Sequence, residues 1–407
     1  MKNSTMFFSE IKGGVTAPKG FLASGISAGI KKKNGPDIAL IFSESPCTAA
    51  GVFTKNIVTG HSLDLCRANI ADGLARCVFI NSGNANACIG QSGYEDARDI
   101  ANECAGILGI SPEEVLTGST GVIGHPLPMD RIKAGIKSAA SALSPEGGPD
   151  ACRAIMTTDT YPKETAAEFD LGGFRTVLGG MAKGSGMIHP DMATLIGIIT
   201  TDAVISRSLL KAALFETVGK SFNKITVDGD TSVCDMVLIL ANGMSGGPEI
   251  VEGSKECDVF MAALDHVAIH LAKAVAADGE GATKLIEINI RNARTQLDAS
   301  KAAKAIANSP LVKTAFFGED ANWGRILTAA GCSGAVFNPN ETTISIGPLV
   351  LFQNGTAIPF NEDDASGILK NKNIEVVVDF GNGAFSDTVW TCDLSHGYID
   401  INANYRT

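Results

Sequence analysis

Apolar residues recur along the chain in short runs that predict a series of β-strands. The run from Leu195 to Thr200 is apolar at most positions, which is typical of a strand covered on both faces. The segment LIEINI, residues 285–290, instead alternates apolar and polar residues and indicates a sheet with one covered face. Strands are predicted at residues 38–42, 77–80, 195–200, 236–241, 285–291, 343–346, 374–380 and 388–391.

Helical periodicity appears between these strands, at residues 96–108, 129–143 and 259–277. In the last of these, Phe260, Leu264, Val267 and Leu271 form one continuous apolar face. Strands and helices are mixed without strict alternation, so the pattern favours a layered, mixed α/β fold over a doubly wound sheet. Two segments rich in turn-forming residues, 144–150 and 242–256, are candidate linkers.

The composition narrows the class of protein. A chain of 407 residues can form about two or three domains. The net charge of -11 argues against a long nucleic-acid interface. No segment resembles a signal peptide or approaches the roughly 20 apolar residues of a membrane-spanning helix, so we expect a cytoplasmic protein without membrane contact. Ten cysteines without a C-x-x-C pair indicate reduced, mostly buried thiols rather than a zinc site.

Several polar clusters allow more than one interpretation. Asp228, Asp230 and Asp235 could bind a cation, but their spacing departs from the EF-hand pattern and favours a turn that feeds a strand. His266 and His270 stand one helical turn apart and could bind a metal, or could lie on a solvated helix face. No carboxylate motif accompanies the two histidines, which favours the second interpretation, and no metal is expected.

Two glycine-rich stretches could carry chemistry. In TGSTGVIGHPLPMD, residues 117–130, a turn before a helix could direct backbone N–H groups at an oxyanion, or could bind a phosphate. The stretch lacks the lysine and the spacing of the common nucleotide-binding loops. In GGMAKGSGMIHPDMATL, residues 179–195, a flexible approach meets a buried strand at Ala193-Thr194. Thr194 is either a rigidly held reactive group or simply the first residue of that strand.

The second stretch closely resembles the self-cleavage signature of the glutamate N-acetyltransferases, also called ornithine acetyltransferases, of cyclic arginine biosynthesis. The resemblance extends in the same order over almost the whole chain, through NSGNANACIG, STGVIG, AIMTTDT, VDGDTSVCD, ADGEGATKL, VKTAFFGEDANWGRIL and DLSHGYIDINANY. Several of these motifs are ten or more residues long, so the similarity is specific.

The resemblance implies self-cleavage between Ala193 and Thr194, which gives an α chain of residues 1–193 and a β chain of residues 194–407. Thr194 then becomes an N-terminal nucleophile whose own α-amine, with an ordinary pKa of about 7.7–8.0, serves as its base. The family pattern places oxyanion stabilisation at Thr120 and Gly121. The family's fold is a layered α/β arrangement that resembles the αββα sandwich of N-terminal-nucleophile hydrolases, with a second α/β lobe.

The resemblance also implies the reaction and its ligands. An acetyl group passes from N2-acetyl-L-ornithine to L-glutamate through an acetyl-threonine intermediate. Some members also use acetyl-CoA, no other cofactor is expected, and the cleaved chains typically form an α2β2 heterotetramer. The implied substrate contacts are Thr157, Lys183, Thr194, Glu280, Asn402 and Thr407. A related N-terminal-threonine amidohydrolase, which would use water as acceptor, and a non-enzymatic binding protein are the alternatives.

Overall fold

The computed structural model describes residues 7–31, 35–189 and 195–404, which form two compact units. Unit 1 comprises residues 1–184, 190–223 and 231–272, and unit 2 comprises residues 185–189, 224–230 and 273–407. The expected linkers, 144–150 and 242–256, both lie inside unit 1 and do not separate the units. The start of segment 144–150 is fixed by backbone hydrogen bonds, because Ser144 and Ala23 each donate an N–H to the other's carbonyl at 3.0 Å.

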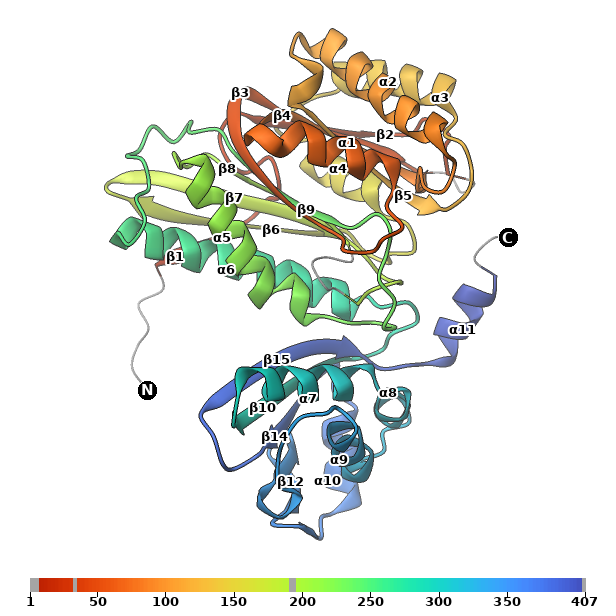
Figure 1. Cartoon of the computed structure of the whole chain (residues 1–407), viewed down its shortest axis with the longest axis vertical. Helices are drawn as coiled ribbons and strands as arrows, with labels where there is room; N and C mark the ends of the chain where they lie inside the picture. The colour runs from red at the N-terminus through yellow and green to blue at the C-terminus, as the bar shows by residue number, and fades with distance from the viewer. Residues whose placement is uncertain (1–6, 32–34, 190–194, 405–407) are drawn as a thin grey trace. The chain divides into compact units, whose positions relative to one another are not determined.

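Unit 1 is built on a nine-stranded mixed sheet with the order β1-β6-β7-β8-β9-β3-β4-β5, in which β2 also pairs with β3. Its strands are β1 (Phe8–Ile11), β2 (Phe21–Ile26), β3 (Ile38–Phe53), β4 (Leu74–Asn84), β5 (Val115–Val122), β6 (Lys163–Leu171), β7 (Phe174–Lys183), β8 (Ile196–Thr201) and β9 (Met236–Ala241). Its helices are α1 (His61–Asn69), α2 (Gln91–Leu108), α3 (Met129–Ser141), α4 (Gly148–Ile155), α5 (Arg207–Lys220) and the first part of α6 (Lys255–Ala277) (Figure 1).

Successive residues of β4 enter different hydrophobic cores. Cys77 and Phe79 pack in a core with α2 and α3. Val78 and Ile80 belong to a second core that includes residues of β8, β9 and α4. Both faces of this strand are therefore covered by apolar side chains, and β8 is likewise buried along its whole length. The prediction of doubly covered strands and of a mixed, layered α/β fold is confirmed.

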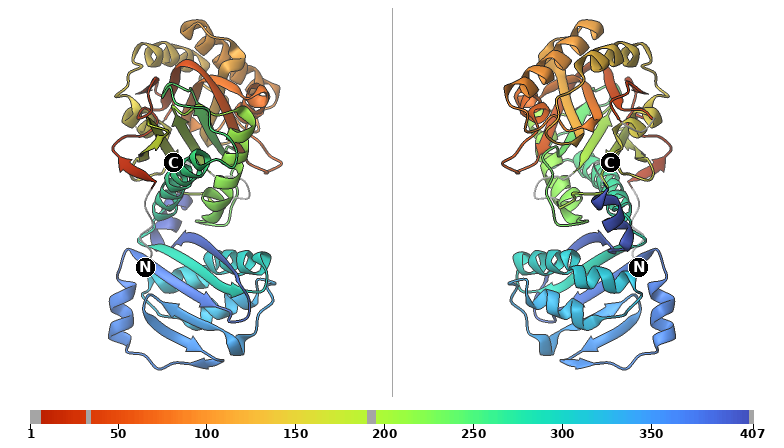
Figure 2. Two further views of the ribbon diagram at one scale, coloured as in Figure 1. Left: turned by 90° about the vertical axis from the view of Figure 1, so that its left-hand side faces the viewer. Right: turned by 90° about the vertical axis from the view of Figure 1, so that its right-hand side faces the viewer.

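Unit 2 carries a six-stranded sheet with the order β13-β12-β11-β14-β10-β15 (Figures 1 and 2). The strands are β10 (Leu285–Ala293), β11 (Thr343–Ile346), β12 (Leu349–Gln353), β13 (Thr356–Ala357), β14 (Asn373–Asp379) and β15 (Phe385–Cys392). The helices are α7 (Gln296–Asn308), α8 (Pro310–Phe317), α9 (Trp323–Gly331), α10 (Glu362–Leu369) and α11 (His396–Ala403).

The two faces of β10 differ as its sequence predicts. Ile286, Ile288 and Ile290 are fully buried in a core with α7 to α10. The intervening Glu287 and Asn289 form polar contacts, and Asn289 Nδ2 donates to Glu287 Oε1 at 3.2 Å. One face of this sheet is therefore apolar and covered, whereas the other carries hydrogen-bonded polar groups.

Helix α6 corrects the expectation that no segment approaches the length of a membrane-spanning helix. By length and composition alone it could span a membrane. Phe260, Leu264 and Val267 are nevertheless fully buried in the protein, as in a core helix. His266 Nε2 lies 2.8 Å from Glu10 Oε1, and its ring contacts Phe8. Within the described residues, no group of three or more His, Cys, Asp or Glu side chains could hold a metal ion.

Candidate active site

The end of β5 carries the two residues assigned to oxyanion stabilisation. The stretch 117–122 is part of this strand and not a turn before a helix, because its backbone pairs in parallel with β4. Thr120 lies opposite Ser82, and Gly121 lies opposite Gly83. Helix α3 begins only at Met129. Thr120 and Gly121 are thus held on a sheet, which is a more rigid support than a free loop.

Gly121 cannot be replaced without disturbing this strand pair. Its φ of +133° lies in a region that residues with side chains rarely adopt. A β-carbon on Gly121 would also stand 2.3 Å from the carbonyl carbon of Gly83. The close approach of β4 and β5 at this point therefore depends on glycine.

A buried network of side chains supports the same strand ends. Ser119 Oγ donates to Asn81 Oδ1 at 2.7 Å and shares a 2.8 Å hydrogen bond with Ser62 Oγ. Asn86 Nδ2 in turn donates to Ser62 Oγ at 3.0 Å. All four residues are almost fully buried, so each hydrogen bond stabilises the backbone next to Thr120.

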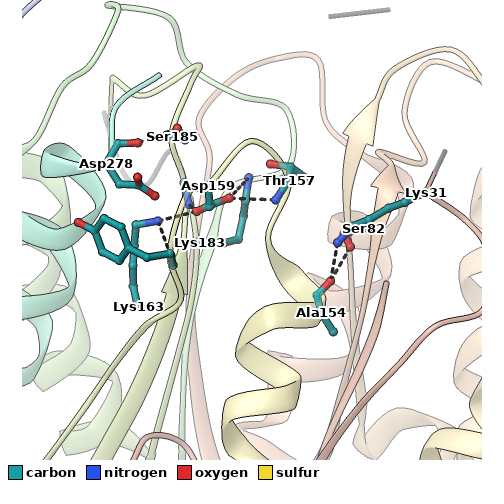
Figure 3. Close-up of polar contacts among 11 residues, drawn as sticks. Lys31, Ser82, Ala154, Thr157, Asp159, Lys163, Lys183, Ser185 and Asp278 are labelled. Atoms are coloured by element: carbon teal, nitrogen blue, oxygen red, sulfur yellow. Dashed lines mark hydrogen bonds and ion pairs between the residues drawn. The ribbon is translucent and has the colours of Figure 1, made fainter. Parts of the chain in front are cut away.

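Thr157 and Lys183 are joined by a carboxylate. Asp159 Oδ2 accepts the backbone N–H of Thr157 at 2.9 Å and lies 4.0 Å from Lys183 Nζ. Asp159 Oδ1 accepts Lys163 Nζ and the N–H of Gly184, both at 2.7 Å. Figure 3 shows Asp159 at the centre of these contacts. The structure therefore brings together two of the predicted substrate contacts, which lie 26 residues apart in the sequence.

Asp159 remains ionised although its side chain is completely buried. Burial by itself would raise the pKa of this carboxyl group. The positive charges of Lys183 and Lys163, with the hydrogen bonds from Lys163 and the Thr157 N–H, outweigh burial and hold the pKa well below its usual value. The cluster is therefore a buried set of charges that compensate one another.

Two contacts at the end of α4 connect this cluster with the strand that pairs with β5. Ser82 Oγ donates to the carbonyl of Ala154 at 2.5 Å, and Lys31 Nζ donates to the same oxygen at 3.4 Å (Figure 3). Ala154 precedes Thr157 by three residues. Burial, opposed by Asp37 and reinforced by Lys183, lowers the pKa of Lys31 to about 8. Lys31 is not among the site residues predicted from the sequence.

Unit 2 brings together two further residues that are predicted to contact the substrate. Asn402, near the end of α11, donates its Nδ2 to Glu280 Oε2 at 2.7 Å. The N–H of Glu280 donates to the carbonyl of Ser185 at 3.0 Å. A β-carbon on Gly186 would lie 2.4 Å from Glu280 Oε2, so a side chain at this position would displace the Glu280 carboxylate. Residues 396–403 form a helix that contacts Glu280 through Asn402.

Comparison with known proteins decides the family. The ArgJ family model matches residues 22–407. A relative from Symbiobacterium thermophilum, named arginine biosynthesis bifunctional protein ArgJ, is 52% identical over 98% of this chain and 99% of that protein. The chain belongs to the ArgJ family. The prediction of an acyltransferase of arginine biosynthesis is thereby confirmed.

Two further proteins are similar to this chain. A protein of the same name from Caldanaerobacter subterraneus subsp. tengcongensis is 48% identical over 98% of this chain and 99% of its own length. A crystal structure of ornithine acetyltransferase complexed with ornithine, from Mycobacterium tuberculosis, is 39% identical, with a TM-score of 0.43. That comparison covers 46% of this chain and 100% of the solved chain.

Three positions that the ArgJ resemblance marks lie outside the described residues: Ala193, Thr194 and Thr407. The last described residue before the cleavage position is His189, and the first after it is Leu195. Leu195 accepts the N–H of Met236 at 2.8 Å, which ties the segment that follows Thr194 to the start of β9.

The approach to the cleavage position is strained and firmly held where it is described. Met187 has a φ of +57°, which is unusual for a residue with a side chain. The Asp228 carboxylate accepts the N–H groups of Met187 and Ile188 at 2.6 and 2.9 Å. It also accepts the N–H of Asp230 at 3.2 Å. These contacts confirm the turn interpretation of this aspartate-rich stretch.

Most of the thiols are buried, and burial makes several of them poor nucleophiles. All ten cysteines lie in described residues and are free, and seven of them are buried, which confirms the prediction that most of the thiols are buried. Burial raises the pKa of Cys47, Cys66 and Cys152 to about 12. These thiols are therefore neutral near pH 7 and unreactive.

Asp235 is a buried acid next to the start of β9. Its Oδ2 has no hydrogen-bond partner among the described residues. Burial raises its pKa well above the usual value, against the hydrogen bonds of Ser232 and the charge of Lys183. An acid with a higher pKa in the folded protein binds a proton on folding, so it disfavours the folded state increasingly as the pH rises above about 3.9.

We therefore expect Asp235→Asn to increase the Tm at pH 8 relative to the natural protein. The gain should shrink as the pH falls toward 4, because the natural carboxyl group is then neutral in the folded state and already about half protonated in the unfolded state. Calorimetry between pH 4 and pH 8 measures this difference. An equal decrease in Tm at every pH would show that the hydrogen bonds of the carboxyl group matter more than its burial.

Proposed function

We propose that this chain transfers the acetyl group of N2-acetyl-L-ornithine to L-glutamate through an acetyl ester on Thr194. The observation that carries the proposal is the ArgJ family match over residues 22–407, with 52% identity to a curated arginine biosynthesis protein. The ornithine-bound relative supports the choice of substrate. Lys183 in unit 1 offers a positive charge and Glu280 in unit 2 a negative one, and an amino-acid substrate with charges of both signs requires both kinds of partner.

The reaction consists of two acyl transfers. Thr194 Oγ attacks the acetyl carbonyl, the carbon–nitrogen bond breaks, and ornithine leaves with a proton on its amine. The α-amine of glutamate then attacks the ester and releases the threonine hydroxyl. Each step passes through a tetrahedral oxyanion, which the Thr120 hydroxyl and the Gly121 N–H stabilise.

The charged side chains have complementary roles in this proposal. Lys183 binds a substrate carboxylate, and Glu280 binds a substrate ammonium group. Lys183 is 8% exposed and Glu280 is 6% exposed, so each charge acts with little screening by water. Thr157 and Asn402 contribute neutral hydrogen bonds, and the terminal Thr407 completes the set.

We further propose that the chain cleaves itself between Ala193 and Thr194, and that the products, residues 1–193 and 194–407, assemble as an α2β2 heterotetramer. The positive φ of Met187 and the close passage of Gly186 beside Glu280 support a strained approach to the cleavage position. Released as an N-terminus, Thr194 has the free amine that the mechanism requires.

Two further proposals concern a second acetyl donor and the cellular compartment in which the protein acts. The relatives are named bifunctional, which supports acetyl-CoA as a second acetyl donor to glutamate. The free thiols support the reducing cytoplasm as the place of action. A coupled assay with glutamate and acetyl-CoA, which detects free CoA, tests the first of these proposals.

Incubation with N2-acetyl-L-ornithine, with and without L-glutamate, tests the main proposal. We expect N-acetylglutamate to form in proportion to the ornithine released, and little acetate to form without glutamate. Rapid release of acetate without glutamate would instead indicate the N-terminal-threonine amidohydrolase. An intact chain of 407 residues with no turnover would indicate the non-enzymatic binding protein.

Asn402→Ala is expected to raise the KM for both substrates by about three- to tenfold, because it removes one net hydrogen bond at the Glu280 carboxylate. Asn404→Ala is the matched control, since the Asn404 side chain donates to the carbonyl of Asp400 on the same helix. Steady-state kinetics should show no change in that control. Equal KM values in the natural protein and Asn402→Ala would exclude Asn402 from substrate binding.

A further inference from the structure

We propose that Asp159 is a positioning residue that holds Lys183 and Thr157 in place for a substrate carboxylate. The inference rests on the proposed function, because it assigns Lys183 to a carboxylate of the substrate. It adds to that function a residue that acts through Lys183 and does not itself touch the substrate.

The Asp159 carboxylate accepts hydrogen bonds from two backbone N–H groups and from one buried lysine side chain. Oδ1 accepts Lys163 Nζ and the N–H of Gly184, and Oδ2 accepts the N–H of Thr157. Gly184 directly follows Lys183, at the end of β7. One side chain thus fixes the backbone on both sides of the site: at Thr157, and next to Lys183.

Lys183 receives charge compensation from Asp159 without a hydrogen bond. Its Nζ lies 4.0 Å from Asp159 Oδ2, which is ion-pair distance and beyond hydrogen-bond distance. Lys183 makes no hydrogen bond from Nζ to any residue that the structure describes. The three donors of its ammonium group are therefore available to a ligand, while the nearby carboxylate keeps the charge stable in a buried position.

The other charged groups around Lys183 are consistent with an anionic ligand. Lys31 and Asp235 both interact electrostatically with Lys183, and burial raises the pKa of Asp235 and so disfavours its charged form. Burial and the charge of Lys183 favour the neutral form of Lys31. Asp159 is the carboxylate that lies at ion-pair distance from Lys183, so removing its charge takes away the compensation of the ammonium group.

A purely structural role is the competing explanation. Asp159 and Lys163 form an ion pair whose two side chains are completely buried, and breaking such a pair destabilises a protein. The two explanations differ in one respect: only a positioning role makes the effect of Asp159 depend on whether the substrate carries a carboxylate.

The experiment compares Asp159→Asn with the natural protein on two donors, N2-acetyl-L-ornithine and the same compound with its α-carboxylate converted to a primary amide. We expect Asp159→Asn to raise the KM for acetylornithine by about ten- to a hundredfold. The KM for the amide should change less than about threefold, and kcat less than KM. Asp159→Glu should restore part of the affinity for acetylornithine.

Asp150→Asn is the matched control, because Asp150 is an exposed aspartate that pairs with Arg153 on α4. It should leave both KM values unchanged. If Asp159→Asn does not fold, Asp159→Asn combined with Lys163→Met removes both charges of the buried pair and takes its place in the comparison.

Equal losses on the two donors would overturn the inference and assign Asp159 a structural role, and so would failure of both variants to fold. Failure of the natural protein to transfer acetyl groups at all would instead contradict the proposed function. An active Asp159→Asn protein with unchanged KM values would contradict the inference alone.

Discussion

Replacing Thr194 by Ala is expected to abolish both self-cleavage and acetyl transfer. In both reactions the Thr194 hydroxyl is the attacking group, first on the carbonyl of Ala193 and later on the acetyl carbonyl. Alanine has no nucleophile, so the protein should remain one chain of 407 residues, and turnover should fall below detection. A denaturing gel and a steady-state assay on the same preparation measure the two effects.

Thr194→Ser is the matched variant for this experiment. Serine keeps a hydroxyl group and loses only a methyl group, so it should retain part of both activities. A Thr194→Ala protein that remains uncleaved but active would contradict the proposed mechanism. Loss of both activities in Thr194→Ser as well would indicate that the methyl group, and not only the hydroxyl, determines the geometry.

Thr120→Val is expected to lower kcat by about a hundred- to a thousandfold with little change in KM. Valine has the shape of threonine without the hydroxyl group, so the variant removes one donor to the oxyanion, whose charge develops mainly in the transition state. Steady-state kinetics separate the two parameters. A raised KM with unchanged kcat would make Thr120 a ground-state binding residue.

Thr117→Val provides the control for Thr120→Val on the same strand. The Thr117 hydroxyl donates to the carbonyl of Ser62 at 2.9 Å, and this hydrogen bond links β5 to α1. Its loss should reduce the Tm and leave the kcat of the folded protein almost unchanged. Gly121→Val tests the oxyanion less cleanly, since the added side chain would meet the backbone of Gly83 and disturb the strand pair while it lowers kcat.

The sequence predicted the long, strongly patterned elements of the fold. All eight predicted strands are present, and the alternation of LIEINI corresponds to the covered and polar faces of β10. The strand β7 was missed, because its Gly179 and Gly180 resemble a loop until their packing is known. Gly179 lies against the backbone of Gly14, a contact between distant segments that no local pattern encodes.

The candidate site was predicted residue by residue from motifs, but its connections were not. The family motifs marked Thr157 and Lys183 as substrate contacts. Asp159, the carboxylate that joins them, lies in the AIMTTDT motif together with Thr157, but no role was predicted for it. Short polar residues near a helix end commonly cap or turn the chain, so Asp159 carried no local signal of its own. Its importance follows from the way β7 passes beside the end of α4.

Mass spectrometry of the purified protein, before and after addition of N2-acetyl-L-ornithine, is the most direct test of self-cleavage and of acetyl transfer through Thr194. We expect two chains, residues 1–193 and 194–407, of which the second begins with TLIGIITTDA. After acetylornithine is added, the second chain should carry one acetyl group on Thr194, and L-glutamate should remove it as N-acetylglutamate. Catalytic activity of the uncleaved protein, or activity without acetylation of the second chain, would contradict the proposed mechanism.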